Sequence, residues 1–392
     1  MMKNAFLPGL ALLAALSLLP GCLAGKTGPA DPGPLKTKAA EPVNLARINQ
    51  PWKGPAGKLA QKGFSQKQLE AVFNSPGLQY TSLPMATKLK ELYPIFYRSD
   101  LIKEIQEKLY QLGYDLRIDG RGGSGTKGVI TQFQKDNRLT PTGETNEATL
   151  AAINRVMKTK TLRPLSGYKA PPAQKPSRTT TYPQFTGAAS LAKIKAHYQE
   201  DKAIFDRMSR QYHVPGEVAA AIMWVETRYG TYFGKHKAAS MLASMSAAAS
   251  DFSLVENQVA ELNKDRGSRE FLKETAVKRG DWALNELAAL LTYSFDNGHD
   301  PTTFPGSIYG AIGWGQFMPS NLIKYGVDGN GDGKVDLFDK TDAIFSIGNF
   351  LKGHGWHGGK MTEEERRAVV MKYNKSGVYV NTVLYVADHL AK

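Results

Sequence analysis

The stretch AAAIMWVETRYG, residues 219–230, is apolar through Val225 and then places Glu226 shortly before a glycine. Its spacing predicts a helix that ends near Gly230. Glu226 falls in the last turn of this helix, on the edge of its apolar face. The face is formed by Val218, Ile222, Val225 and Tyr229.

A carboxylate in this position is expected to lose protons reluctantly. Burial beside Trp224 and Tyr229 disfavours the charged form, and so does the negative end of the helix dipole. Both effects raise the pKa of Glu226, which is what a general acid requires. The alternative from this helix alone is a structural glutamate paired with Arg228 or another cation.

The chain has 392 residues, 42% of them hydrophobic, and a formal net charge of +14. This length allows two or three domains. The basic excess predicts a polyanionic partner or surface. Nucleic acid, anionic lipid and anionic cell-wall polymer all meet this description.

The N-terminus has the form of an export signal, with Lys3 followed by the apolar run AFLPGLALLAALSLLP. LPGC (19–22) resembles a bacterial lipobox, which predicts a signal peptide at 1–21 and lipidation of Cys22. A plain secretory signal is the alternative. Cys22 is the only cysteine, so its lipidation excludes disulfides and thiol chemistry. An exported, membrane-anchored chain has no expected role with nucleic acid.

Changes in composition divide the rest of the chain. A stretch rich in Gly, Pro and Lys is a predicted flexible tether, and a basic, proline-rich stretch is a predicted semi-rigid linker. The remaining segments have helical patterns, and the fold class is therefore mainly α. Ser65 with Gln68 is a predicted capping box at the start of one of these helices. The predicted parts are the tether 22–55, a helical segment 56–94, a small module 98–156, the linker 157–187 and a helix-rich domain 188–392.

The small module has a helical apolar face made of Leu101, Ile105, Leu109 and Leu112, which we expect Asp100 to cap. IQEKLYQLGY, the turn IDGRGGSGT, VITQFQKDNRL and TGETNEATLAAI follow in order. Together they resemble the type 1 peptidoglycan-binding domain. The resemblance implies a three-helix bundle that binds cell-wall glycan and peptide. A bundle with another partner is the alternative.

Two later segments favour a sugar-binding cleft. GSIYGAIGWGQFMPS (306–320) combines aromatic and apolar groups with an amide, and VVMKYNKSGVYVNTVLYVADHL (369–390) adds tyrosines and an asparagine. Aromatic rings stack on the C–H faces of sugars, and amides bind hydroxyl groups.

With VETRYG, the Asp-rich loop after residue 326 and GNFLKGHGW, these segments resemble the lytic transglycosylases of glycoside hydrolase family 103 over residues 188–392. The resemblance implies a lysozyme-like helical catalytic domain that includes the segment 56–94. It implies that Glu226 is the single catalytic acid and base, and that Phe350 stands where the family often has a tyrosine. The residues implied to bind the sugar are Ser307, Gln316, Phe317, Met318, Phe350, Tyr373, Asn374 and Tyr379.

Most glycosidases use two carboxylates, but no sequence spacing brings Asp251 or Asp281 to Glu226. A single acid fits a lytic transglycosylase, in which the 6-hydroxyl of N-acetylmuramic acid attacks its own C1 and leaves a 1,6-anhydro end. A hydrolytic muramidase and a non-catalytic peptidoglycan-binding lipoprotein are the alternatives.

The loop VDGNGDGKVDLFD contains an EF-hand pattern of oxygen ligands over residues 328–339, with glycine at the sixth position. It predicts a structural Ca²⁺ site beside the cleft. A solvated Asp/Gly turn is the alternative. The predicted ligands are Asp328, Asn330, Asp332, the Lys334 carbonyl, Asp336 and Asp339.

The predicted partners are therefore peptidoglycan and, through Cys22, a membrane. We expect a monomer that faces the periplasm. Leu23 follows the lipidated cysteine where an aspartate would favour retention in the inner membrane, so the outer membrane is the expected location.

Overall fold

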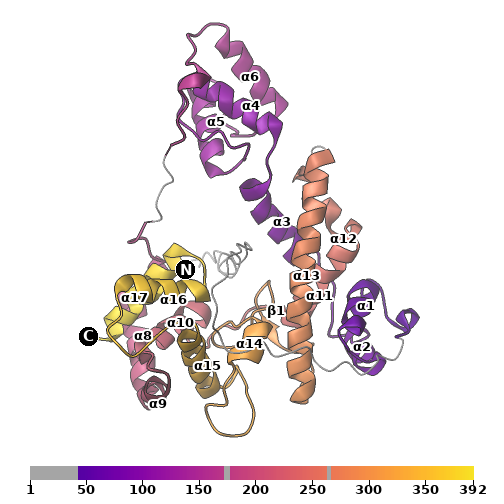
Figure 1. Ribbon diagram of the computed structural model, residues 1–392, viewed down its shortest axis with the longest axis vertical. Helices are drawn as coiled ribbons and strands as arrows, with labels where there is room; N and C mark the ends of the chain where they lie inside the picture. The colour runs from indigo at the N-terminus through magenta and orange to yellow at the C-terminus, as the bar shows by residue number, and fades with distance from the viewer. Residues whose placement is uncertain (1–42, 172–176, 263–265) are drawn as a thin grey trace, which may run out of the picture. The chain divides into compact units, whose positions relative to one another are not determined.

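The computed structural model of the protein describes residues 43–171, 177–262 and 266–392, and it is mainly helical, as the sequence predicts (Figure 1). The predicted signal peptide 1–21, Cys22 and the first part of the predicted tether lie outside the described residues. No single helix in the described ranges is long and apolar enough to cross a membrane, although the bent pair Ala238–Ser250 and Ser253–Leu262 meets the criteria jointly.

The α-helices are α1 (Lys53–Gln61), α2 (Gln66–Phe73), α3 (Leu83–Phe96), α4 (Asp100–Gln111), α5 (Ser124–Asp136), α6 (Glu147–Met157), α7 (Pro183–Thr186), α8 (Ala188–Glu200), α9 (Lys202–Tyr212), α10 (Gly216–Thr227), α11 (Ala238–Ser250), α12 (Ser253–Glu256), α13 (Arg266–Asp296), α14 (Pro319–Tyr325), α15 (Lys340–Gly353), α16 (Glu363–Tyr373) and α17 (Gly377–Leu390). The 3₁₀ helices are Leu45–Arg47, Leu165–Gly167 and Asn257–Leu262. Strands β1 (His236–Lys237) and β2 (Pro305–Gly306) form an antiparallel pair.

The chain divides into two compact units. Unit 1 contains the described residues up to Pro84, from Ser177 to Leu254 and from Val277 onward; unit 2 contains those of Met85–Lys175 and Val255–Ala276. The helical segment predicted at 56–94 is therefore divided at Pro84, and its first part belongs to the unit that carries Glu226.

In unit 2, α4, α5 and α6 form the predicted small bundle (Figure 1) around Ile105, Leu109, Ile130 and Phe133. The buried Gln106 folds the Gly-rich turn: its side-chain oxygen accepts hydrogen bonds from the N–H groups of Asp119 (2.9 Å) and Gly120 (2.8 Å). The expected cap was misplaced by one position, because Asp100 is the first helical residue and Ser99 is the N-cap.

The predicted linker 157–187 is wrong over part of its length, because several of its residues pack onto folded structure. In unit 2, Arg163 forms an ion pair with Asp115 (2.8 Å), and Tyr168 packs edge-on against Tyr110. The Tyr168 hydroxyl also accepts a hydrogen bond from the Ile118 N–H at 2.9 Å. Composition alone did not reveal these aromatic contacts.

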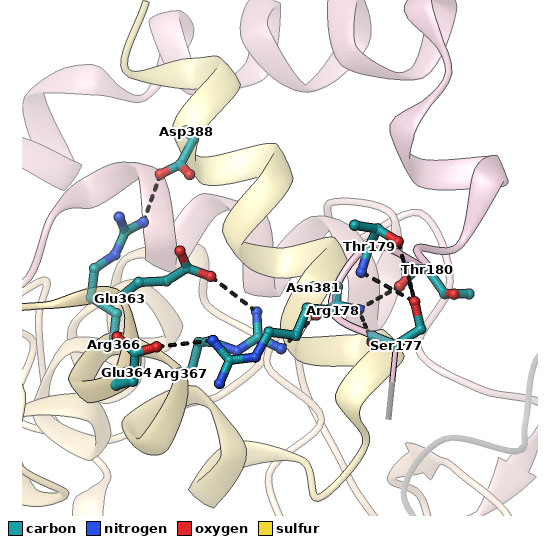
Figure 2. Close-up of polar contacts among 10 residues, drawn as sticks. All are labelled: Ser177, Arg178, Thr179, Thr180, Glu363, Glu364, Arg366, Arg367, Asn381 and Asp388. Carbon is teal, nitrogen blue, oxygen red and sulfur yellow. Dashed lines mark hydrogen bonds and ion pairs between the residues drawn. The ribbon is translucent and has the colours of Figure 1, made fainter. Parts of the chain in front are cut away.

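The C-terminal end of the same predicted linker is held on unit 1 by Asn381, which is buried on α17 (Figure 2). The Asn381 amide donates to the carbonyls of Ser177 (3.0 Å) and Thr180 (2.7 Å) and accepts from Arg367 (2.6 Å). Exposed ion pairs surround it, including Arg178 with Glu364 at 2.9 Å. Exposed pairs contribute little, so buried polar groups of α17 attach this segment: the Asn381 amide, and the Thr382 hydroxyl, which accepts from the Tyr182 N–H at 2.9 Å.

The predicted tether 22–55 also extends too far. Ile48 and Trp52 are 2% and 4% exposed, so both belong to the core, and α1 begins at Lys53. Helix α1 packs against α11. The predicted capping box of Ser65 and Gln68 is present at the start of α2. The prediction was based on the Gly, Pro and Lys content of this stretch, which gave no sign that Ile48 and Trp52 are buried.

Helix α10 lies at the centre of unit 1, where α8, α9, α15 and α17 pack around it. The sequence predicts one apolar face, but this helix is buried on all sides. Within Gly216–Thr227, Glu217 and Glu226 are the two residues that are not buried. Glu226 is therefore partly accessible to solvent although the residues next to it on α10 are buried.

Candidate active site

The chain leaves α10 through a tight left-handed turn directly after Glu226. The helix ends at Thr227, earlier than the predicted end near Gly230, and Arg228, Tyr229 and Gly230 have φ values of 49°, 57° and 78°. The Thr227 side-chain oxygen accepts a hydrogen bond from the Gly230 N–H at 3.0 Å. These contacts fix the last turn of the helix, and with it the backbone of Glu226.

Gly230 is required by the close approach of Trp314. A Cβ atom at residue 230 would lie 2.4 Å from the indole ring, well inside van der Waals contact. The indole itself is fixed, because its Nε1 donates to the Phe338 carbonyl at 3.0 Å. The turn after the acid and the GWGQF segment are therefore fitted to each other.

A buried carboxylate, Asp201, holds the same turn from the other side. It accepts a hydrogen bond from the Tyr229 hydroxyl (2.7 Å) and forms an ion pair with Lys340 (2.7 Å), the first residue of α15. Asp201 is 6% exposed, and buried acids are tolerated when they are paired. The sequence analysis missed this contact, because nothing in the spacing connects residues 201, 229 and 340.

Glu226 lines a pocket of about 130 Å³ together with most of the predicted sugar-binding residues. Of the predicted set, Ser307 and Tyr379 are outside the lining. The lining residues are Glu226, Gln316, Phe317, Met318, Asn321, Phe350, Lys372, Tyr373, Asn374 and Lys375. Asn321, Lys372 and Lys375 were not predicted.

Ser307 has a structural contact instead. Its side-chain oxygen accepts hydrogen bonds from the N–H groups of Tyr309 (3.2 Å) and Ala311 (3.0 Å). It thereby stabilises the turn that leads into the GWGQF segment. Its expected contact with the sugar stays a prediction.

Aromatic rings form one wall of the pocket. The Tyr373 hydroxyl donates to the Gly315 carbonyl at 2.6 Å, and its ring lies 4.9 Å from that of Phe350 and 5.8 Å from that of Phe317. Phe350 also stacks on His354 at 4.0 Å. The wall is therefore closely packed, and Phe350 presents no hydroxyl to it.

Burial raises the pKa of the Glu226 carboxyl to about 7, while the nearby Tyr379 hydroxyl opposes part of this rise. The Tyr379 hydroxyl is buried next to Glu226, and its interaction with the ionised carboxyl is the cause that opposes the rise. No ion pair to Glu226 is present among the residues that the structure describes, and Arg228 is exposed. The electrostatics fit the acid better than the alternative of a paired structural glutamate.

A second buried acid, Glu286 on α13, holds Ser320, which lies two residues after the pocket-lining Met318. Its carboxylate accepts hydrogen bonds from the Ser320 N–H and the Ser320 hydroxyl, both at 2.9 Å. Burial raises the pKa of Glu286, and these bonds oppose the rise. Ser320 follows Met318 by two residues, so Glu286 holds the end of the GWGQFMPS segment. No sequence pattern indicated this contact, because Glu286 and Ser320 are far apart along the chain.

The Asp-rich loop before α15 is organised by its own backbone. The Asp328 carboxylate accepts hydrogen bonds from the N–H groups of Gly331 (2.6 Å), Asp332 (3.2 Å) and Gly333 (2.8 Å). Asp339, predicted as a ligand, caps α15 by accepting from Thr341 at 2.8 Å.

The fully buried Asp342 closes the same loop. It accepts hydrogen bonds from the N–H groups of Gly329 (2.9 Å), Asn330 (3.2 Å) and Asp336 (2.7 Å). This carboxylate was not among the predicted ligands. In the described ranges no three acidic, histidine or cysteine side chains converge on a common point that would hold a metal ion.

Comparison with known proteins gives two family matches. Residues 132–368, more than half of the chain, match the family described as "Transglycosylase SLT domain". Residues 98–153 match a peptidoglycan binding domain. Both matches confirm the resemblances that the motifs indicated.

Relatives and solved structures are similar over different extents. Membrane-bound lytic murein transglycosylase B of Escherichia coli (strain K12) is 35% identical over 151 residues, 38% of this chain and 34% of the relative, so the match spans about a third of the relative's length. Catenated lytic transglycosylase SltB1 from Pseudomonas aeruginosa is 20% identical, with a TM-score of 0.45 over 69% of this chain and 98% of that one. Escherichia coli Slt35 in complex with calcium is 18% identical, with a TM-score of 0.45 over 73% and 97%.

Proposed function

The chain belongs to the transglycosylase SLT domain family, and we propose that it is a lytic transglycosylase of peptidoglycan. It breaks the β-1,4 bond between N-acetylmuramic acid and N-acetylglucosamine, and the muramyl sugar closes into a 1,6-anhydro ring. The observation that carries the proposal is Glu226, whose pKa is raised to about 7 where it lines the pocket.

Glu226 first acts as the acid. Near neutral pH a large fraction of the carboxyl is protonated, and a positioned carboxylic acid can donate its proton to the bridging oxygen as the bond to C1 breaks. The glucosamine sugar leaves with this proton as its 4-hydroxyl group. The burial of Glu226 supports this step, because desolvation disfavours the ionised form and keeps the proton on the acid until the bond breaks.

Glu226 then acts as the base. The ionised carboxylate takes the proton from the 6-hydroxyl of the muramyl sugar as that oxygen attacks C1. The attacking group belongs to the same sugar, so its effective concentration is high and no activated water is needed. The acid ends the cycle protonated, and no water is consumed.

The pocket lining supports a one-acid mechanism. Among the described residues, Glu226 is the only acid that lines it. The two other acids considered are engaged elsewhere: Asp251 accepts from Ser253 at 2.6 Å, and Asp281 pairs with Lys58 at 2.8 Å. Hydrolytic glycosidases place a second carboxylate across the scissile bond, so the lining disfavours a muramidase.

The substrate sugar is proposed to lie in the pocket beside Glu226, in contact with the predicted residues that line it. These residues are Gln316, Phe317, Met318, Phe350, Tyr373 and Asn374. Tyr379 approaches Glu226 from α17, and Ser307 is proposed to orient the 2-acetamido group. Aromatic rings beside amides support binding of a sugar, because the rings stack on C–H faces and the amides bind hydroxyl groups.

Products from purified cell-wall sacculi test the reaction type. We expect the released muropeptides to be lighter by one water than the products of hydrolysis, because the 6-hydroxyl replaces water as the attacking group. Mass spectrometry measures this difference directly. Hydrated reducing ends would identify a muramidase, and the absence of products would favour the non-catalytic wall-binding alternative.

The module at 98–156 is proposed to hold the enzyme on peptidoglycan, supported by the domain match at 98–153. Lipidation of Cys22 would add an anchor in a membrane facing the periplasm, proposed as the outer membrane on the basis of Leu23. The basic charge of +14 suits both anionic surfaces. The proposed active form is a monomer.

The Asp-rich loop is proposed to bind a structural Ca²⁺ ion. Its donors are all oxygen atoms, which suits Ca²⁺, and Gly331 and Gly333 have the positive φ values of a tight loop. Asp339 is already the cap of α15, whereas the buried Asp342 holds three backbone groups of the loop. The proposed ligands come from Asp328, Asn330, Asp332, Lys334, Asp336 and Asp339.

Calcium binding predicts a shift in thermal stability. Ligand present at about 100 times its dissociation constant stabilises the folded state by about 2.7 kcal/mol, which corresponds to a rise in Tm of about 5 °C for a domain of this size. The Asp328→Ala variant should lose this rise, whereas the exposed Asp296→Ala control should keep it. If EDTA and Ca²⁺ give the same melting curve for the wild type, the proposed site is wrong.

A further inference from the structure

Two lysines at the mouth of the pocket have no assigned role in the proposed reaction. Lys372 lies in the last turn of α16, and Lys375 lies in the short connection between α16 and α17. Both are exposed and both line the pocket that contains Glu226. Both residues therefore contribute to the same opening.

Within the described ranges, no acidic side chain forms an ion pair with either lysine. At the other end of α16, Glu363 and Glu364 form ion pairs with Arg367 and Arg178 (Figure 2). Glu226 does not compensate the charges of Lys372 and Lys375 while it holds its proton, which it does below about pH 7.

The charge of Lys372 is close enough to act on a neighbouring side chain, His354. His354 stacks on Phe350, which lines the pocket. Burial is the main cause that lowers the pKa of His354, and the charges of Lys324 and Lys372 lower it further. The rim of the pocket on this side is therefore positive. An anionic group that enters the pocket would be attracted by the ammonium groups of both Lys372 and Lys375.

Most of the proposed substrate is uncharged. The two sugars of the glycan carry hydroxyl and acetamido groups, and the anionic groups are the carboxylates on the lactyl arm of the muramyl sugar. They belong either to the attached peptide or, where the peptide has been removed, to the lactyl group itself. An exposed ammonium group without a partner suits such a carboxylate.

We infer that Lys372 and Lys375 form a carboxylate-binding subsite that recognises the lactyl arm of the muramyl sugar or the peptide attached to it. This inference rests on the proposed function of the pocket. The subsite selects muramyl sugars over neutral glucosamine polymers and fixes which side of the glycan faces α16.

Binding without turnover tests the subsite. In a Glu226→Gln background, calorimetry measures the Kd of four soluble tetrasaccharides. They are a glycan fragment with peptide, the same fragment after amidase removal of the peptide, the peptide-bearing fragment with its carboxylates amidated, and neutral chitotetraose. The variants are Lys372→Gln with Lys375→Gln, and the control Lys193→Gln, an exposed lysine on α8 away from the pocket.

The double variant should weaken binding of the acidic fragments about tenfold, since two exposed ion pairs with the ligand are lost and each contributes modestly. Binding of the amidated fragment and chitotetraose should change less than about twofold, and the tenfold effect should shrink in about 0.5 M NaCl. If affinity falls for both acidic fragments, the lactyl carboxylate alone is enough for recognition. If affinity falls only for the peptide-bearing fragment, the lysines recognise the peptide. The Lys193 control should match the background.

Equal losses for all four ligands, or no loss for any, would overturn the subsite. The outcome is separable from the reaction type. Anhydro products from the wild type with unchanged affinities in the double variant would remove the subsite alone. Selective loss of acidic ligands together with hydrated products would keep the subsite and remove the transglycosylase assignment.

Discussion

Replacing Glu226 with glutamine should reduce the release of muropeptides from sacculi by at least about 10³-fold, because acid–base groups contribute about 10² to 10⁴ each and this residue performs both steps. Glutamine keeps the shape of the side chain but has no acidic proton to donate. Quantitative mass spectrometry of anhydro ends released per unit time measures the loss.

The matched control is Glu200→Gln, an exposed glutamate at the end of α8. It removes one carboxylate of the same type from the same unit and should leave the rate unchanged. Binding to sacculi should persist in both variants, because the module at 98–156 is intact. A Glu226→Gln variant with more than a tenth of the wild-type rate would contradict the assigned role.

The raised pKa of Glu226, about 7, predicts a pH dependence in both activity and stability. Only the protonated form donates the first proton, so the rate should fall about tenfold per pH unit on the alkaline side of the pKa. Rates from about pH 5 to pH 9 should place that decline near pH 7. A decline centred near pH 4.5 would mean that the carboxyl is effectively solvated.

The sign of the stability effect follows from the same shift. In the unfolded chain Glu226 titrates near the ordinary glutamate pKa of 4.5, and in the folded protein near 7. Below pH 4.5 the carboxyl is protonated in both the folded and the unfolded state, so it does not lower the free energy of unfolding. As pH rises through the higher value, the folded state bears a penalty of up to about 3 kcal/mol, at 1.36 kcal/mol per pKa unit.

Glutamine carries no such penalty. The free energy of unfolding of Glu226→Gln, measured by urea titration, should therefore match the wild type at about pH 4 and exceed it at about pH 8. The difference should be smaller than the full 3 kcal/mol, because Glu226 is partly exposed to the pocket. A constant difference between the two proteins at all pH values would argue against a buried, neutral acid.

Local patterns predicted a substantial part of this molecule. The helix that ends after Glu226, the capping box at Ser65 and the apolar core of the small bundle each depend on neighbours within about one helical turn. The family resemblance, which was indicated by the order of the motifs, also predicted a set of sugar-binding residues, and most of this set lines one pocket.

The errors and omissions share a physical cause, which is contact across long separations. Ile48 and Trp52 lie in a stretch with the composition of a tether, but their side chains are part of the core. Glu286 contacts Ser320, and Asp201 contacts Lys340; periodicity describes which face of a helix is apolar but not which element covers it. Lys372 and Lys375 flank the predicted Tyr373 and Asn374, so attention to charge beside the motif could have found them.

Asp201 also determines which parts of unit 1 open together. It joins the turn after Glu226, through Tyr229, to the start of α15, through Lys340. If either partner moves away, a buried carboxylate loses a compensating contact at a cost of several kcal/mol. Transient local unfolding therefore cannot easily release the Asp-rich loop and leave the turn after Glu226 in place. We expect the two segments to open as one cooperative unit, so the position of the Glu226 backbone depends partly on residues outside the pocket lining.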